Sequence, residues 1–197
     1  MDRTPYKESY ILQLGQLKAI IDITNGRMIS DPPDTLIYEN ANFFSKAFLV
    51  TMCAYLESYL KDALMVVIDQ MNVRLQSAKL PHNLVKWSLN IDKELKDSEF
   101  KFEQLKITIK KKQLDDYISG NPFKTKELFK KFGIDLEQNQ LFNSQKEEIN
   151  AIVVKRNKIL HHNDEASDVS STDLTNNIES LTKYIKNIDE ILCRHLD

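Results

Sequence analysis

Apolar residues recur every three or four positions along most of this chain, which is the spacing of amphipathic helices. A first helix is predicted over about residues 6–23, and Asn25-Gly26 follows it as a stop signal. A longer helix is predicted over about residues 35–75. It is apolar almost all round between Phe43 and Ile68, as expected of a central helix that its neighbours cover on every side.

Two more helices are predicted near the end of the chain. One begins at Ser144, with Glu147 three residues later completing a capping-box pattern, and runs to about His161. The last covers about residues 170–196, where one face carries the apolar residues Leu174, Ile178, Leu181, Ile185, Ile188 and Leu192. Together the helices predict an all-α bundle with a long central helix.

The segment from about residue 77 to residue 142 has a weaker pattern, broken by prolines. We predict an insertion of short helices. Asn121-Pro122 has the form of a cap and first turn for a short helix that ends near Phe132-Gly133. Alternation between Lys101 and Lys110 leaves a brief pair of strands open as an alternative.

The composition supports a helical class and a single domain over residues 1–197. A chain of 197 residues is long enough for one well-buried core, and four glycines and five prolines are too few for a turn-rich β protein. The formal net charge of −2 argues against a generally basic protein that coats nucleic acid, although a local cleft can still be positive.

The cysteines and the hydrophobic runs bear on location. Cys53 and Cys193 lie in apolar helical patterns without a CxxC partner, so no disulfide framework is expected. The first residues lead into no signal-peptide segment, and charged residues interrupt each hydrophobic run before it could span a bilayer. We therefore expect a cytoplasmic protein with no membrane partner.

One arginine breaks the pattern of the helix predicted to end near His161. On a helix of 3.6 residues per turn, Arg156 shares a face roughly 100° wide with four aliphatic residues, Ile149, Ile152, Val153 and Leu160. Burying an unpaired guanidinium would cost several kcal/mol. The helix must therefore face a polar cleft, an anion or a partner chain at Arg156.

Arg156-Asn157, followed after three residues by His161, resembles the motif of the HEPN superfamily, whose small helical domains include many prokaryotic toxin and defence ribonucleases. The resemblance extends to residues 48–60, an aromatic-rich run leading to Glu57-Ser58 that is similar to the long second helix of RiboL-PSP-type HEPN proteins. It implies a HEPN-like helical bundle, a motif at a helix end, and two subunits whose motifs share a cleft.

The residue types suit metal-independent cleavage of RNA. Attack of the ribose 2′-hydroxyl on the adjacent phosphorus needs acid/base groups and a cation for the growing phosphate charge. His161 would do acid/base work, Arg156 would hold phosphate oxygens, and Asn157 would orient the histidine or the phosphate. Lys155 and Lys158 are weaker candidates for RNA contact, and neither a cofactor nor a metal is expected.

Helix geometry raises a difficulty for a site within one chain. In an unbroken helix, Arg156 and His161 would lie roughly 140° apart around the axis, too far to meet on one phosphate. Either the helix ends near Leu160, with Asn163-Asp164 as its punctuation, or a second copy of the chain completes the site.

Simpler interpretations stay open for each of these residues. Arg156 would pair with a buried carboxylate such as Glu57, leaving His161 and His162 on the surface at a helix end. Glu57 and Lys61 are also spaced as an ordinary helical salt bridge, so Glu57 is only an accessory candidate. His162 is the alternative to His161 as the active histidine.

The resemblance predicts an endoribonuclease of a bacterial toxin–antitoxin or antiphage system, acting as a homodimer, with an antitoxin or another defence protein as a candidate partner. The alternative is a non-catalytic HEPN module that binds RNA, a nucleotide or a partner protein. A helical scaffold without nucleic-acid function is a third interpretation. HEPN toxins silenced by a nucleotidyltransferase carry tyrosine two residues after the motif histidine. Asn163 stands there in this chain, which argues against that control.

Overall fold

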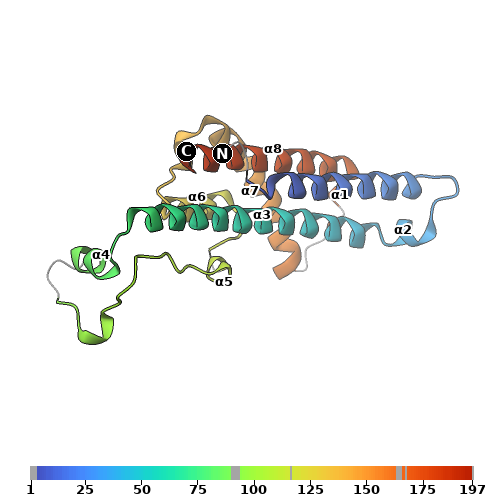
Figure 1. Cartoon of the computed structure of the whole chain (residues 1–197). Helices are drawn as coiled ribbons and strands as arrows, with labels where there is room; N and C mark the ends of the chain where they lie inside the picture. The colour runs from blue at the N-terminus through green and yellow to red at the C-terminus, as the bar shows by residue number, and fades with distance from the viewer. Residues whose placement is uncertain (1–3, 90–93, 116, 163–165, 167, 197) are drawn as a thin grey trace.

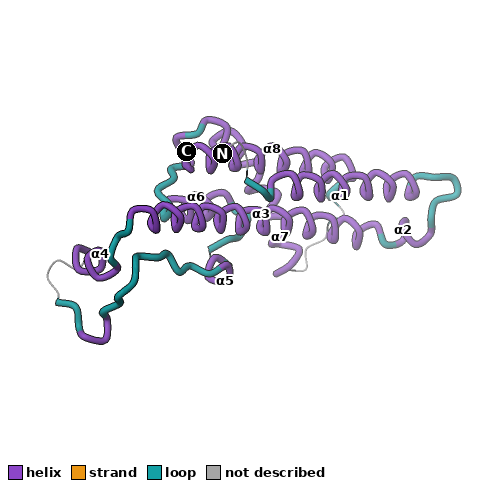
Figure 2. Tube along the Cα trace, viewed as in Figure 1, coloured by secondary structure: helices purple, strands orange, loops and turns teal. Residues whose placement is uncertain are grey.

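The structure is a computed structural model that describes residues 4–89, 94–115, 117–162, 166 and 168–196, the side chain of His162 excepted. No β-strand occurs in these ranges, so the all-α class is confirmed. The helices, shown in Figures 1 and 2, are α1 (Lys7–Met28), α2 (Thr35–Glu39), α3 (Ala41–Ala78), α4 (His82–Leu89), η1 (Asp97–Glu99), α5 (Lys111–Leu114), α6 (Pro122–Lys130), η2 (Leu136–Gln138), α7 (Gln140–His162) and α8 (Ser171–Leu196).

Four long helices make the core. α1, α3 and α8 run side by side, and α7 passes across α3 while packing against α8 (Figure 1). The apolar stripe of α8 is buried as its spacing predicted, and α3 is buried along most of its middle, from Phe48 to Ile68. Burial of these apolar faces is the main force that holds the bundle together.

The first two predicted helices differ from the observed ones at their ends. α1 continues through Asn25-Gly26 to Met28, so the predicted stop there was wrong. Its last turn has a tertiary partner, because the Ser171 hydroxyl donates a hydrogen bond to Asn25 Oδ1 over 2.9 Å. The second predicted helix is interrupted at Asn40, which separates α2 from α3.

The predicted insertion of short helices is present and contains α4, η1, α5, α6 and η2. Asn121 caps α6 as predicted, because its Oδ1 accepts from the backbone N–H groups of Phe123 and Lys124. The alternative strand pair between Lys101 and Lys110 was wrong, since that stretch forms only an isolated bridge between Gln104 and Pro81. In Figure 1, α4 and η1 project beyond the end of α3 as an arm.

The start of α7 was also misplaced by the sequence. The helix begins at Gln140, and Asn139 Oδ1 accepts from the backbone N–H of Phe142. Ser144 lies one turn inside, where its hydroxyl donates to the carbonyl of Leu141. An asparagine cap therefore replaces the predicted capping box of Ser144 and Glu147.

A buried carboxylate fastens the N-terminal segment to the bundle. Asp189 of α8 has none of its side chain exposed, and it accepts hydrogen bonds from the Thr4 backbone and hydroxyl and from the Tyr59 hydroxyl. Lys7 lies 3.3 Å from Asp189 Oδ2 and supplies the opposite charge, while Cys193 Sγ lies 3.8 Å from the same oxygen. We call these five residues the Asp189 cluster.

Candidate functional site

α7 brings its arginine against α3. Ile149, Ile152 and Val153 are buried, and one turn later the Arg156 side chain is 13% exposed and pairs with Glu57 through a short contact from Nη2 to Oε1. Leu160 was expected on this buried face and is 51% exposed.

Ile159 takes the buried position instead of Leu160. Residue 159 lies about 60° to one side of Arg156 around the helix axis, and residue 160 lies about 40° to the other side. The sequence pattern does not indicate which of these two sides packs against the rest of the bundle.

The hydrogen-bonding capacity of Arg156 is only partly used within the chain. A guanidinium has five N–H donors, and the buried Nε of Arg156 has no hydrogen-bond partner among the described residues. Cys53, one turn before Glu57 on α3, adjoins the guanidinium. Burial raises the pKa of its thiol to about 11, and the nearby charge of Arg156 opposes that rise. A thiol with that pKa is no nucleophile near neutral pH. We call Cys53, Glu57 and Arg156 the Arg156 cluster.

Glu57 is more open than the arginine that it holds. Its side chain is 28% exposed and lines a hollow of about 220 Å³ together with Ala54, Ser58, Lys61, Asp115 and Ile118. The sequence suggested a helical salt bridge between Glu57 and Lys61. Instead, Lys61 pairs with Asp115 and Glu57 pairs with Arg156. The Arg156 cluster therefore sits beside an open, polar hollow.

Gly120 closes one side of the Arg156 cluster. It has a φ of +63°, a conformation that L side chains rarely adopt, and a Cβ atom there would lie 3.4 Å from Glu57 Cγ and 3.5 Å from Glu57 Oε1. The pattern of apolar and polar residues predicted no role for Gly120. A glycine just before the Asn121 cap was the available signal.

The motif helix does not end before the histidine. α7 continues through His162, which removes a helix end near Leu160 as the means of bringing Arg156 and His161 together. His161 is exposed, whereas Arg156 faces α3. Asn163-Asp164 and the His162 side chain lie outside the described residues. In one chain, therefore, the described part of the motif presents its arginine and its histidine in different directions.

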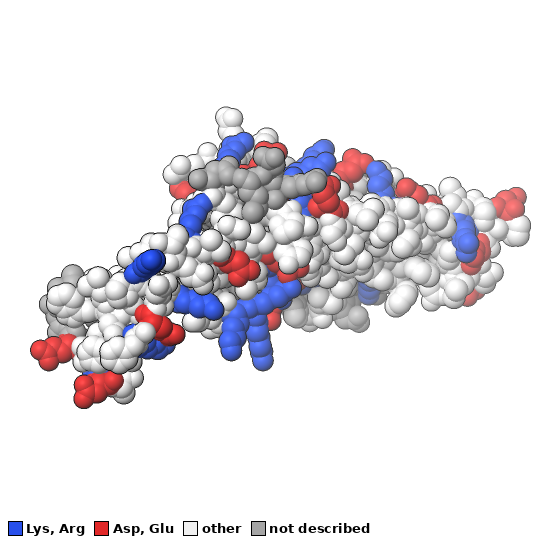
Figure 3. Space-filling view, viewed as in Figure 1, with Lys and Arg blue, Asp and Glu red and all other residues white. Residues whose placement is uncertain are grey.

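The remaining candidates on α7 have different surroundings. Asn157 is half-buried next to Arg156, and Lys158 is exposed. Lys155 lies 2.8 Å from Asp168, so an RNA phosphate would compete with that carboxylate for its charge. Figure 3 shows basic and acidic side chains interspersed over the face that it draws, in keeping with the small net charge.

The described residues contain no group of three or more His, Cys, Asp or Glu side chains arranged to hold a metal ion. None of the described helices combines the length and the apolar character needed to cross a bilayer.

The fold and the motif define an all-helical domain of the HEPN type, a class whose members are often ribonucleases or bind nucleotides. The model of the RiboL-PSP-HEPN family matches residues 16–194, and the chain belongs to that family. No curated protein and no solved structure matches the chain. The match spans α3, the short-helix insertion and the motif helix, so it covers both segments on which the sequence resemblance rested.

Proposed function

We propose that the protein is a metal-independent endoribonuclease whose active site is completed by a second copy of the chain. The observation that carries this proposal is the state of Arg156: it is held against α3 by Glu57, yet its buried Nε lacks a partner among the described residues. The guanidinium is 13% exposed next to the hollow lined by Glu57, and its charge and planar set of N–H donors suit a phosphate.

The chemistry follows from the residue types. His161, exposed at the end of α7, exchanges a proton with the 2′-hydroxyl or the leaving 5′-oxygen, and Arg156 stabilises the charge on the phosphate between them. Asn157 lies four residues before His161, on the same helical face, and orients the imidazole or the phosphate. Glu57 keeps the guanidinium in position, and Lys155 and Lys158 contact the RNA backbone nearby.

A face of α3 beside the motif suits a second copy. Phe43, Ala47, Val50 and Ala54 recur at helical spacing along α3, and of these Phe43 and Ala54 are exposed. Leu160 on α7 adds another exposed apolar side chain next to His161. A two-fold dimer that covers these residues would bring the two motif helices together and add the missing histidine to each arginine.

The direct test is incubation of the purified protein with total RNA and with tRNA in excess EDTA, beside the His161→Ala variant. We expect cleavage by the wild type, and a loss of about 10²–10⁴-fold in rate for the variant. His82→Ala is the matched control, because it removes a histidine from the arm while leaving α7 intact. Light scattering on the same samples reports whether the protein is a dimer.

The products distinguish the mechanism. Attack by the 2′-hydroxyl leaves a 2′,3′-cyclic phosphate and a 5′-hydroxyl, and a single 2′-deoxy substitution at the cut site abolishes cleavage there. Continued cutting at that site, or 5′-phosphate ends by mass spectrometry, would replace the proposed mechanism with attack by water. RNA binding without cleavage would assign the protein to the non-catalytic HEPN modules.

The biological role that we propose is that of a toxin or effector in a bacterial toxin–antitoxin or antiphage system, with a protein partner that holds it in check. Expression of the wild type should then slow bacterial growth, and His161→Ala should relieve the effect. Arg156→Ala should relieve the growth defect as well. Because loss of the arginine leaves Glu57 without its partner, circular dichroism must show that this variant is still folded.

A further inference from the structure

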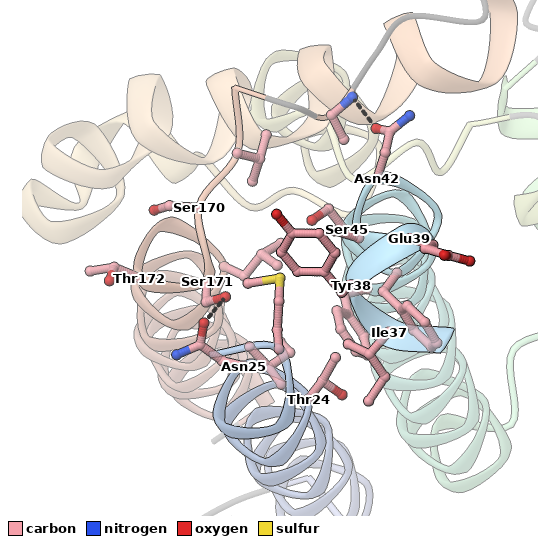
Figure 4. A pocket seen from close by; sticks show the side chains of 18 residues that line it. Thr24, Asn25, Ile37, Tyr38, Glu39, Asn42, Ser45, Ser170, Ser171 and Thr172 are labelled. Atoms are coloured by element: carbon pink, nitrogen blue, oxygen red, sulfur yellow. Dashed lines mark hydrogen bonds between the residues drawn. The ribbon is translucent and has the colours of Figure 1, made fainter. Parts of the chain in front are cut away.

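A second hollow lies apart from the Arg156 cluster, where four elements meet. It has a volume of about 610 Å³ and lies between the end of α1, α2, the start of α3 and the segment leading into α8 (Figure 4). That volume is within the range of about 300–1,000 Å³ typical of small-molecule sites. Two hydrogen bonds fix its walls, from Ser171 Oγ to Asn25 Oδ1 and from the Ala166 N–H to Asn42 Oδ1.

The lining combines an apolar floor with an unpacked aromatic ring. Ile21, Ile37, Phe48 and Leu174 are buried and form the apolar part. Tyr38 from α2 is 63% exposed although it lines the hollow, and Figure 4 shows its ring standing over the space between α1 and α3. A large exposed ring at the edge of a hollow offers a face for a second flat ring to stack on.

The polar groups of the hollow favour an uncharged ligand. Its rim carries the hydroxyls of Thr24, Ser45 and Thr172, none of which hydrogen-bonds to another described residue. Among the described residues that line the hollow, Glu39 alone is charged, and it is acidic. At the start of α8, the Ser170 hydroxyl accepts from the backbone N–H of Asp173, and the Asp173 carboxylate accepts from the backbone and hydroxyl of Ser170. This carboxylate places a negative charge at the helix end, which disfavours an anionic ligand there.

We propose that this hollow is a nucleobase subsite, which takes an uncharged heteroaromatic ring by stacking on Tyr38 and by hydrogen bonds to the rim. The inference rests on the proposed ribonuclease function, since the base would belong to the RNA substrate. Ala166, in the wall, is five residues after His161 and so lies no more than about 18 Å from it. A base near the cut phosphate can therefore reach the hollow and bias which sequence is cut.

The test is the binding of free nucleosides, followed by the backbone amide resonances of the full chain. Adenosine, guanosine, cytidine and uridine are titrated separately, with ribose 5-phosphate as the probe that lacks a base. We expect at least one nucleoside to shift resonances of residues 37–45 and 169–174, and ribose 5-phosphate to leave them unchanged. Tyr38→Leu should weaken that binding about tenfold, as loss of a stacking ring does, whereas Tyr38→Phe should retain it.

The matched control is Phe102→Leu, which removes an aromatic ring that is 99% exposed in the arm and lines no part of the hollow. In RNA cleavage, Tyr38→Leu should broaden the cut-site preference while Phe102→Leu leaves it unchanged. Cleavage without any nucleoside shift at the hollow overturns the subsite and leaves the ribonuclease proposal intact. Nucleoside binding at the hollow without RNA cleavage supports the subsite and overturns the ribonuclease.

Discussion

The Asp189 cluster and the Arg156 cluster are two polar groups in the same bundle, and they differ in how completely their members are satisfied. Asp189 is fully buried and receives hydrogen bonds from Thr4 and Tyr59 and the charge of Lys7. Arg156 pairs with one carboxylate, that of Glu57, which lines a hollow. The Nε of Arg156 has no hydrogen-bond partner in the described ranges.

This difference indicates which cluster serves the fold and which is available for chemistry. A buried charge that is fully paired is expensive to disturb and has no capacity left for a ligand. A guanidinium that is 13% exposed next to the hollow lined by Glu57, and that holds a single carboxylate, can take another partner without unfolding the chain. The contrast assigns the N-terminal fastening to Asp189 and the proposed phosphate contact to Arg156.

The largest expected effect is recovery of activity by mixing two inactive proteins. If Arg156 of one copy works with His161 of the other, Arg156→Ala and His161→Ala are each inactive alone. After unfolding and refolding together, heterodimers contain one intact site in two. About a quarter of the wild-type sites should therefore return. Cleavage of a fluorescent RNA measures the recovery.

A matched mixture distinguishes a shared site from one within a chain. In this control, His161→Ala is unfolded and refolded together with His161→Gln in the same way. Neither chain supplies His161, so the mixture should stay inactive. If the first mixture also stays inactive while light scattering shows dimers, Arg156 and His161 do not act across the interface, and the shared cleft is wrong.

The next largest effect concerns the Asp189 cluster. Asp189→Ala leaves Lys7 and Tyr59 without their buried acceptor, so we expect the free energy of unfolding to fall by about 3–5 kcal/mol. Urea denaturation measures it, and the fraction that stays folded should keep the wild-type activity per molecule. Glu190→Ala is the control. That neighbouring carboxylate is exposed, and its ion pair with Arg194, at 3.6 Å, is exposed too, so its loss should cost little stability. A loss below about 1 kcal/mol for Asp189→Ala would mean that the cluster does not hold the fold.

Much of the fold was predictable because burial follows periodicity. The apolar stripe of α8 and the covered middle of α3 were both predicted, and both are buried. The errors lie at helix ends, where tertiary contacts decide. Asn25 helps to keep α1 helical beyond its predicted stop by bonding Ser171, a residue far away in the sequence that no local pattern could identify.

The site was harder to predict, because the same sequence signal has two outcomes. Asp189 stands four residues after Ile185 and three before Leu192, so it interrupts an apolar stripe as Arg156 does. Only the structure separates them, by placing Thr4 and Tyr59 on one charge and a single carboxylate on the other. The catalytic roles of Arg156 and His161 stay predictions.

A smaller expected effect is the loss of stability at alkaline pH that the two buried cysteines cause. Burial raises the pKa of Cys53 to about 11, with Arg156 opposing the rise, and burial followed by the charge of Asp189 raises the pKa of Cys193 to about 11. A folded-state pKa above the unfolded value gives stability that is present below about pH 9 and is lost as the pH rises through about 11.

Cys53→Ala should remove the part of this loss that comes from Cys53. For a thiol pKa raised from 9.0 to about 11, that part is about 2–3 kcal/mol in the free energy of unfolding. Urea denaturation at pH 8 and pH 11 measures the difference between wild type and variant, which excludes the contribution of the buried tyrosines. In Arg156→Gln the loss attributable to Cys53 should grow, since the opposing cation is gone. An unchanged difference would remove Cys53 from the Arg156 cluster.

The smallest effect should come from Glu57→Gln, which keeps a hydrogen-bond acceptor for Arg156 and removes only the charge. Glu57 is 28% exposed, so water screens part of the pair, and we expect a loss of about 1 kcal/mol in the free energy of unfolding. Cleavage should change more than stability does, because a guanidinium without its carboxylate is less firmly positioned for phosphate.

A double-mutant cycle with Arg156→Gln separates these two contributions. If the pair only stabilises the fold, the coupling energy measured by urea denaturation accounts for the loss, and the activity per folded molecule is the same in Glu57→Gln and wild type. If the pair positions the arginine, kcat falls in Glu57→Gln while KM for RNA changes little, and adding Glu57→Gln to Arg156→Gln causes no further fall. We expect the fall in kcat, because Arg156 is proposed to contact the phosphate and Glu57 to hold it in position.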